Sequence, residues 1–427
     1  MAQHLSKPDF RSMRLSLASL LSLLSLVIHA QDVMRNAVFR DDVHTIQCYP
    51  ADNKLGYPLI ALHSGEQLEF HFDLFAEDFE SLRFGVIHCD HNWKPSALDY
   101  AQYVRGFQTD QINTIEVGFN TLFDFIHYSF SYPTDMSQPL ISGNYAMVVY
   151  SGMDMNDTSQ WVATFRFLIY EQMATIRPNL HSSSIVAQRY THQEIDFDLA
   201  HAGFPINDPM RDINALIIQN FDWKRTSDFL KPIFIQPDLL TFDYFGGENT
   251  FEGCAEWRFF EVKDLRYQSS QVEHIAQLDD GYHVYLRPCV PEGKRAYSSW
   301  QDINGNFLVK NDQGGDDNLE ADYVWVHFIL NMPEISDASI FIEGAFNSFG
   351  KLDACTYDRG LGAYTAKLLL KQGYYNYRFV LRDLYNSADN IRVTEGSHAG
   401  TKNVYHVIMY MYDRNVGADR IVAVTSD

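Results

Sequence analysis

The densest group of side chains able to do chemistry is the run His88 to His91, with the sequence HCDH. Imidazole, thiolate and carboxylate groups are ligands for metals such as zinc. In an extended strand, however, His88 and Asp90 share one face while His91 points to the other, so three-point ligation needs a distortion that the sequence does not require. The Asn-Trp-Lys-Pro segment that follows predicts a strand end and an ordered loop, and no metal site is expected here.

A second candidate is the acidic segment from Asn311 to Asp322. Its acids are Asp312, Asp316, Asp317 and Glu320. Calcium takes oxygen ligands from loops, but the alternating spacing and central glycine of an EF-hand are missing. The segment therefore indicates a solvated acidic loop, which is either a linker between domains or an exposed hairpin.

Motifs for nucleophilic or phosphate chemistry are also missing. The sequence contains no GxSxG elbow, and the His63-Ser64-Gly65 triplet lacks the strand and helix that would surround one. No glycine-rich loop opens a helix as a phosphate site requires, and no pair of carboxylates is marked out for glycoside hydrolysis. We therefore expect no enzyme, no catalytic residue, no cofactor and no bound metal.

The elements that would position these side chains are mainly strands. Aromatic residues make up 14% of the chain, with 25 Tyr and 30 Phe, and aromatic side chains favour half-buried sheets. The composition favours an all-β protein. The turn SGNY from Ser142 to Tyr145, directly before a strand, is typical of immunoglobulin-like β-sandwiches, so we expect such domains in tandem. In the segment LEFHFDL, from Leu68 to Leu74, the alternation of period two places Leu68, Phe70 and Phe72 on one face.

The length of 427 residues predicts roughly three domains. We expect an N-terminal β-sandwich domain at 31–172, a middle β-rich domain at 173–318 and a C-terminal β-sandwich domain at 319–427. The middle boundary is placed in the acidic segment, where the hydrophobic pattern breaks.

The C-terminal domain resembles the glycogen-binding and other E-set modules that accompany amylolytic enzymes. SIFIEGAFNSFG and the strands up to Leu381 carry this resemblance. Where such modules place a sugar-stacking Trp, this chain has Phe349, whose phenyl face is a poorer platform. Carbohydrate is therefore not the expected partner, although a periplasmic or surface glycan-binding protein remains the alternative function.

Residues 1–30 are predicted to be a secretory signal peptide. Lys7, Arg11 and Arg14 precede an apolar run from Leu15 to Ile28, which is too short to span a bilayer comfortably. No later segment offers a membrane span. The net charge of −22, with 33 Lys and Arg against 55 Asp and Glu, argues against a nucleic-acid partner because phosphate binding needs basic residues.

Five cysteines are scattered along the chain without metal-ligand spacing. They are Cys48, Cys89, Cys254, Cys289 and Cys355. Export permits a disulfide such as Cys48 to Cys89, but the odd count leaves at least one thiol unpaired.

Several long segments of the chain resemble one known family. They include IHCDHNWKPS from Ile87, NTFEGCAEWRFFEVKDLRYQS from Asn249, LEADYVWVHF from Leu319 and LLLKQGYYNYRFVL from Leu368. In order and spacing they are similar to the plug protein family of the type IX secretion system. This resemblance implies a non-catalytic gating subunit in the periplasm, associated with the outer membrane. Its partner would be the large outer-membrane translocon barrel, whose periplasmic opening it closes.

The motif-dense segments supply candidate residues for contact with this partner. They are Trp93, Lys94, Trp257, Arg258, Phe260, Arg266 and Tyr267. Exposed aromatic and arginine side chains are common anchors of protein interfaces. Two competing roles stay open, because alternating aromatics such as Trp257 and Phe260 often form a core, and Arg258 and Arg266 can pair with neighbouring acids.

Overall fold

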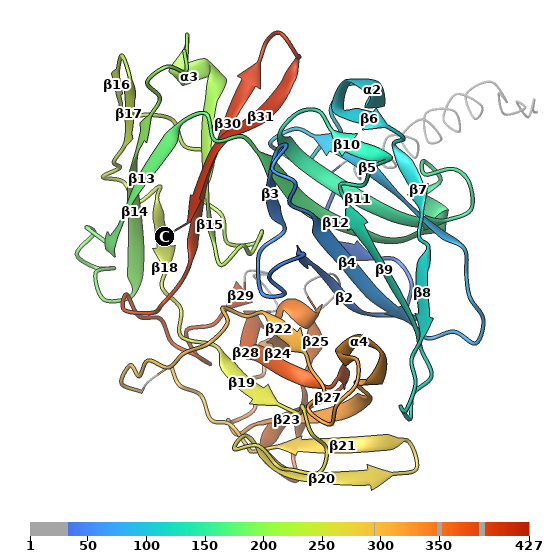
Figure 1. Ribbon diagram of the computed structural model, residues 1–427. Helices are drawn as coiled ribbons and strands as arrows, with labels where there is room; N and C mark the ends of the chain where they lie inside the picture. The colour runs from blue at the N-terminus through green and yellow to red at the C-terminus, as the bar shows by residue number, and fades with distance from the viewer. Residues whose placement is uncertain (1–32, 294, 348–351, 384–388, 427) are drawn as a thin grey trace, which may run out of the picture.

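A computed structural model describes residues 33–293, 295–347, 352–383 and 389–426. Strands form nearly all the regular structure, in antiparallel sheets packed as sandwiches, which confirms the all-β prediction (Figure 1). The predicted signal peptide and Phe349 lie outside the described residues. Among the helices within the described ranges, none is long and apolar enough to cross a membrane.

The first unit is a sandwich of two sheets. Its first sheet has the order β1 (Ala37–Val38), β12 (Trp161–Tyr170), β11 (Gly143–Ser151), β5 (Leu82–Cys89) and β7 (Thr109–Gln111), with β3 (Leu59–Ala61) parallel to β12. Its second sheet has the order β2 (Val43–Pro50), β4 (Leu68–Leu74), β9 (Ile126–Tyr132) and β8 (Thr114–Val117). Leu68, Phe70 and Phe72 of β4 are fully buried in the core between the sheets, as their alternation predicts.

The middle unit also contains two sheets, and the last two strands of the chain belong to it. One sheet has the order β13 (Thr175–Ser182), β14 (His192–Ala200), β17 (Leu239–Phe242) and β16 (Phe234–Gln236), with β18 (Thr250–Glu252) beside β14. The other joins β15 (Ile213–Gln219), β30 (Tyr405–Asp413) and β31 (Ala418–Ser426). The short helix α3 (Pro209–Asp212) leads into β15. The chain therefore leaves this unit after β18 and returns to complete its core.

The first and middle units stack into four layers of sheet. Ala215 and Ile217 of β15 face the middle unit's own core, whereas Leu216 and Ile218 pack against the first unit in a separate apolar cluster. Successive side chains of a strand point to opposite faces, so an unbroken apolar run is what a strand buried on both faces requires. The joint between these two units is thus a core in its own right.

The third unit lies below the other two in Figure 1. One sheet has the order β20 (Val272–Leu278), β21 (Gly281–Leu286), β23 (Tyr323–Leu330), β27 (Ala363–Lys371) and β26 (Thr356–Asp358). The other is built on β28 (Gly373–Asp383), which pairs with β19 (Arg258–Glu261), β22 (Phe307–Val309), β24 (Ala338–Glu343) and β29 (Asp389–Asn390), while β25 (Asp353–Ala354) flanks β24.

The boundary predicted near residue 318 falls inside this third unit. The strand β21 pairs directly with β23 across the acidic segment, and that segment forms the short helix α4 (Asp317–Glu320) within one domain. The predicted C-terminal domain at 319–427 also includes β30, but β30 pairs with β15 of the middle unit. Strand pairing here joins residues far apart in the sequence, so a linear division could not follow it.

A buried ionic cluster joins the third unit to the first. The carboxylate of Asp73 on β4 accepts hydrogen bonds from Lys371 Nζ at 2.6 Å, Tyr323 Oη at 2.7 Å and His127 Nδ1 at 2.7 Å. The side chains of Asp73 and Lys371 are each 1% exposed. Burial opposes ionisation of Asp73, but the charge of Lys371 and the hydrogen bond from His127 outweigh it and hold the pKa of this carboxyl below its ordinary value.

Candidate functional site

An exposed apolar site lies at one end of the first unit, on a small excursion from its sandwich. The helix α2 (Tyr100–Tyr103) leads into β6 (Val104–Gly106), which pairs with β10 (Ser137–Pro139) in a two-stranded sheet (Figure 1). Phe107 directly follows β6, and Met136 directly precedes β10. Their side chains are 61% and 53% exposed. Tyr100 is also exposed. We call Tyr100, Phe107 and Met136 the β6–β10 patch.

The local backbone explains why this patch projects. Gly106 has a φ of +101°, and a Cβ at this position would lie 2.1 Å from the carbonyl oxygen of Met136. Only glycine fits so close an approach in this conformation. The Phe107 backbone N–H then donates to that same oxygen at 2.8 Å. The two strands are therefore clamped together while the side chains of Phe107 and Met136 stay in solvent.

The predicted pair Trp93 and Lys94 divides between the interior and the surface. Trp93 is 4% exposed and packs edge-on against Trp223 of the middle unit, with ring centroids 4.7 Å apart. The guanidinium of Arg166 lies 4.4 Å from the Trp93 ring. Trp93 therefore belongs to the joint between the units and cannot face a partner, while Lys94 is exposed.

Trp257 and Phe260 also serve the interior. Phe260 is fully buried and stacks on Tyr375 at a centroid distance of 5.1 Å, so it is a core residue and the prediction of partner contact is corrected. Trp257 is 8% exposed, and the guanidinium of Arg378 lies 3.9 Å from its ring. Phe260 lies on the face of β19 that packs into the core of the third unit, and Trp257 directly precedes this strand, so neither side chain offers much surface.

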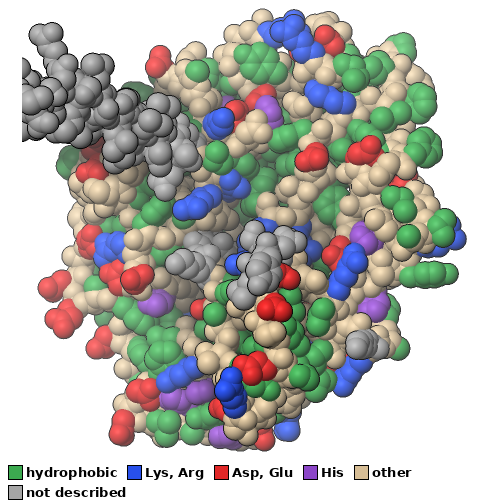
Figure 2. All heavy atoms as spheres, turned by 180° about the vertical axis from the view of Figure 1, so that it is seen from behind, with side chains coloured by type: hydrophobic (Ala, Val, Ile, Leu, Met, Phe, Trp, Pro, Cys, Tyr) green, Lys and Arg blue, Asp and Glu red, His purple; other side chains and the backbone are tan. Residues whose placement is uncertain are grey.

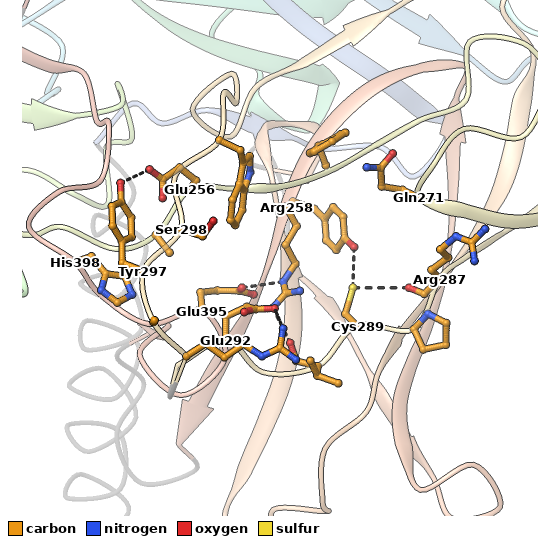
Figure 3. Close-up of a pocket in the computed structure, with 18 of the residues that line it drawn as sticks. Glu256, Arg258, Gln271, Arg287, Cys289, Glu292, Tyr297, Ser298, Glu395 and His398 are labelled. Atoms are coloured by element: carbon orange, nitrogen blue, oxygen red, sulfur yellow. Dashed lines mark hydrogen bonds and ion pairs between the residues drawn. The ribbon is translucent and has the colours of Figure 1, made fainter.

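Arg258 lines a cavity of about 490 Å³ in the third unit (Figure 3). Its Nε donates to Glu395 at 2.8 Å, and its terminal nitrogen donates to the carbonyl oxygen of Val290 at 2.9 Å. The side chain is 11% exposed and that of Glu395 is 5% exposed. Burial disfavours the cation, but Glu395 outweighs this effect and raises the pKa of Arg258. Its donors are thus used mainly inside the protein.

The same cavity holds a thiol, Cys289, whose nearest polar side chain is the hydroxyl of Tyr377 at 3.3 Å. Burial raises the pKa of Tyr377 well above its ordinary value, so this phenol is a poor base. In Figure 3, His398 lies at the opposite end of the cavity, beside Tyr297. The cavity therefore does not bring the thiol and the imidazole together as a nucleophile and base would require.

Arg266 and Tyr267 remain at the surface. The Arg266 side chain is 62% exposed and pairs with Asp264 at 2.7 Å, and Tyr267 is 73% exposed. The Arg266 guanidinium lies 5.8 Å from the Tyr267 ring. On the face shown in Figure 2, acidic, basic and apolar side chains are interspersed, so the acid excess is not gathered into a single patch on that face.

The candidate metal ligands of the HCDH run and of the acidic segment have structural roles within the protein. His91 Nδ1 bonds to Asp419 at 2.7 Å and ties the first unit to β31, while His88 is buried in the first unit beside Tyr145. Asp316 caps α4 by accepting from the backbone N–H groups of the next turn. All five cysteines are free, which excludes the disulfide considered for Cys48 and Cys89.

Comparison with known proteins identifies the first unit. Residues 43–171 match the family described as type 9 secretion system plug protein 1st domain. We call the first unit the plug domain after the family that it matches. This confirms the family resemblance expected from the sequence, over the segment that contains the β6–β10 patch and every strand of the first sandwich except β1.

The whole arrangement also recurs in a solved structure. The crystal structure of a hypothetical protein from Parabacteroides merdae ATCC 43184 has a TM-score of 0.87 and 27% sequence identity, and the alignment covers 93% of this chain and 100% of that chain. No curated protein matches the chain. The arrangement of the three units therefore recurs in at least one other protein.

Within the first unit, the sequence predicts partner contact at Trp93 and Lys94 and not at the residues of the β6–β10 patch. Trp93 is part of the segment IHCDHNWKPS, which carries the family resemblance, but its indole packs against Trp223 in the joint with the middle unit. Phe107 and Met136 gave no signal, because each is a single apolar residue in a polar stretch. Gly106 was the one signal in the sequence, because an isolated glycine in a strand pattern indicates a constrained backbone, here with a positive φ.

Proposed function

We propose that the protein is a non-catalytic plug subunit of the type 9 secretion system. It binds the large outer-membrane translocon barrel from the periplasm and closes the periplasmic opening of that barrel. The observation that carries this proposal is the match of residues 43–171 to the plug protein first domain. The predicted signal peptide supports a periplasmic location, and the association with the outer membrane comes through the barrel.

The packing between the units supports a closing role. A plug has to hold its shape against its partner, and a preformed surface avoids the entropy cost of ordering a flexible one on binding. The apolar cluster between the plug domain and the middle unit is one such restraint. The buried contact between Asp73 and Lys371 is a second, because it ties the third unit to the plug domain.

The β6–β10 patch is our candidate for the surface that meets the barrel. Phe107 and Met136 offer apolar area that is already held in place, and aromatic residues and methionine are enriched in protein interfaces. Lys94, Arg266 and Tyr267 are further candidates because their side chains are accessible. Trp257 and Arg258 are weaker ones, since each lines a cavity and is engaged within the protein.

The experiment is a pull-down of the tagged protein from detergent-solubilised outer membranes, followed by mass spectrometry. We expect one very large barrel protein in near-equal amount. Replacing both Phe107 and Met136 with serine is expected to weaken its retention at least tenfold, because the apolar contact area is lost.

Met153→Ser is the matched control. Met153 also belongs to the plug domain, lies on another loop and is 85% exposed. Met153→Ser should retain the barrel as the unmodified protein does. Failure of the unmodified protein to retain any barrel would contradict the proposed function. Equal loss with the control and the double variant would contradict only the assignment of the surface.

A further inference from the structure

A crevice of about 430 Å³ lies where the three units meet. The first unit contributes Arg35, Lys54 and Arg166 to its wall, the middle unit contributes Trp223, and the third unit contributes Asn306. We call this space the junction crevice. Its size lies within the range of pockets that take small organic ligands or a few residues of a peptide.

The wall of the junction crevice is basic, although the chain as a whole carries a net charge of −22. Its ionisable cations are Arg35, Lys54, Arg166, Lys224, Arg225 and Arg378, against only two carboxylates, Asp222 and Glu343. A local excess of this sign inside an acidic protein attracts anions, because a cleft focuses the field of the charges that line it.

Three of these six cations form ion pairs with carboxylates of the wall. Glu343 pairs with Lys224 at 3.1 Å and with Arg378. Asp222 lies 3.7 Å from Arg225. Both carboxylates of the wall are therefore paired with cations of the middle and third units.

The cations on the first-unit side lack such partners. Over the described ranges of the chain, no carboxylate lies within 4.0 Å of the Arg35 or Arg166 guanidinium, and Lys54 has only Asp317 at the 4.0 Å limit. The Nε of Arg166 donates to the carbonyl oxygen of Met34, which leaves its terminal nitrogens for another acceptor. Burial, with a further contribution from the charge of Arg35, lowers the pKa of Arg166 to about 10, so the cation persists at neutral pH but is poorly solvated.

The rest of the wall suits a peptide. Tyr57, Phe221 and Trp223 contribute aromatic rings. The Oδ1 of Asn36 accepts from the backbone N–H of Arg166, and its Nδ2 group can donate to a peptide carbonyl. A guanidinium matches a carboxylate in a planar, two-bonded geometry. Aromatic rings beside the guanidinium groups favour a peptide that carries both carboxylates and an aromatic or aliphatic side chain.

We infer that the junction crevice binds a short acidic polypeptide segment, with Arg35 and Arg166 holding its carboxylates and the aromatic wall holding a neighbouring apolar side chain. A segment seated there touches all three units at once. The inference stands apart from the proposed function, because it concerns a different surface from the β6–β10 patch and would hold whether or not the protein closes a barrel.

Isothermal titration calorimetry of the mature protein with the peptide acetyl-Glu-Phe-Glu-amide tests this inference, with acetyl-Gln-Phe-Gln-amide as the neutral counterpart. We expect one binding site for the acidic peptide and at least tenfold weaker binding of the neutral one. Arg35→Gln should weaken the acidic peptide at least tenfold. This side chain is exposed and has no carboxylate within 4.0 Å among the described residues, so the substitution is expected to leave the fold intact.

Arg359→Gln is the matched control, because that arginine is 84% exposed and belongs to the third unit away from the crevice wall. It should bind the acidic peptide as the unmodified protein does. Absence of binding up to about 1 mM peptide, equal binding of the neutral peptide, or equal weakening by both variants would overturn the inference. Binding of inorganic phosphate in place of the peptide would overturn it as well.

Discussion

Replacing Lys371 with methionine is expected to destabilise the folded protein by about 3–5 kcal/mol. The ammonium group is 1% exposed and donates to the equally buried Asp73 at 2.6 Å. It also donates to the carbonyl oxygen of Asn318 and lies 3.9 Å from the Phe125 ring. Methionine keeps most of the volume but leaves a carboxylate without its counter-ion in a dry site, where an unpaired charge is most costly.

The effect should be concentrated on the joint between the units, because Asp73 belongs to the plug domain and Lys371 to the third unit. Urea unfolding followed by circular dichroism measures the loss, and limited proteolysis should cut first between these units. The double variant Asp73→Asn with Lys371→Met removes both charges and should recover most of the lost stability. A single variant as stable as the unmodified protein would show that the pair does not hold the units together.

Acidification from about pH 7.5 to about pH 5 is expected to cost about 2 kcal/mol for each of His88 and His406. Burial lowers the pKa of both imidazoles from 6.5 to about 4. A group whose pKa is lower in the folded state supports folding above the unfolded value and loses that support as the pH falls towards the folded value. The window for both residues therefore runs from pH 6.5 down to about 4.

His406 offers the cleaner test of this pH dependence. Its ring packs edge-on against Tyr57 and Phe221 at the joint between the units, and its Nδ1 has no hydrogen-bond partner. His406→Phe keeps a ring but cannot take up a proton, so the difference in unfolding free energy between the two pH values should shrink by about 2 kcal/mol. His63 is exposed, and His63→Asn should leave that difference unchanged. An unaltered pH dependence in His406→Phe would refute the assignment.

Much of the local structure was predictable from the sequence. The alternation from Leu68 to Leu74 marks β4 because only one face of this strand meets the core. The strand end predicted after His88 is also present, since β5 ends at Cys89. These features depend on neighbours in the sequence, and sequence patterns report such neighbours directly.

The division into units was not predictable in the same way. The strand β15 pairs with β30, matching Ile213 with Met411, and nothing in either strand names its partner. Both strands carry apolar side chains on their two faces. This pattern indicates a strand buried between two layers of sheet, but it does not identify the layers. The β6–β10 patch escaped prediction for the same reason, because Phe107 and Met136 become neighbours only through the pairing of their strands.

Single-channel recording can show whether this protein closes a translocon barrel, as we propose. The purified barrel is placed in a planar lipid bilayer, and the mature protein is added to the periplasmic side. Closure predicts that the open-state current falls to near zero at one plug per barrel and returns when the plug is washed out. A barrel whose current is unchanged while the plug is bound to it would contradict the claim.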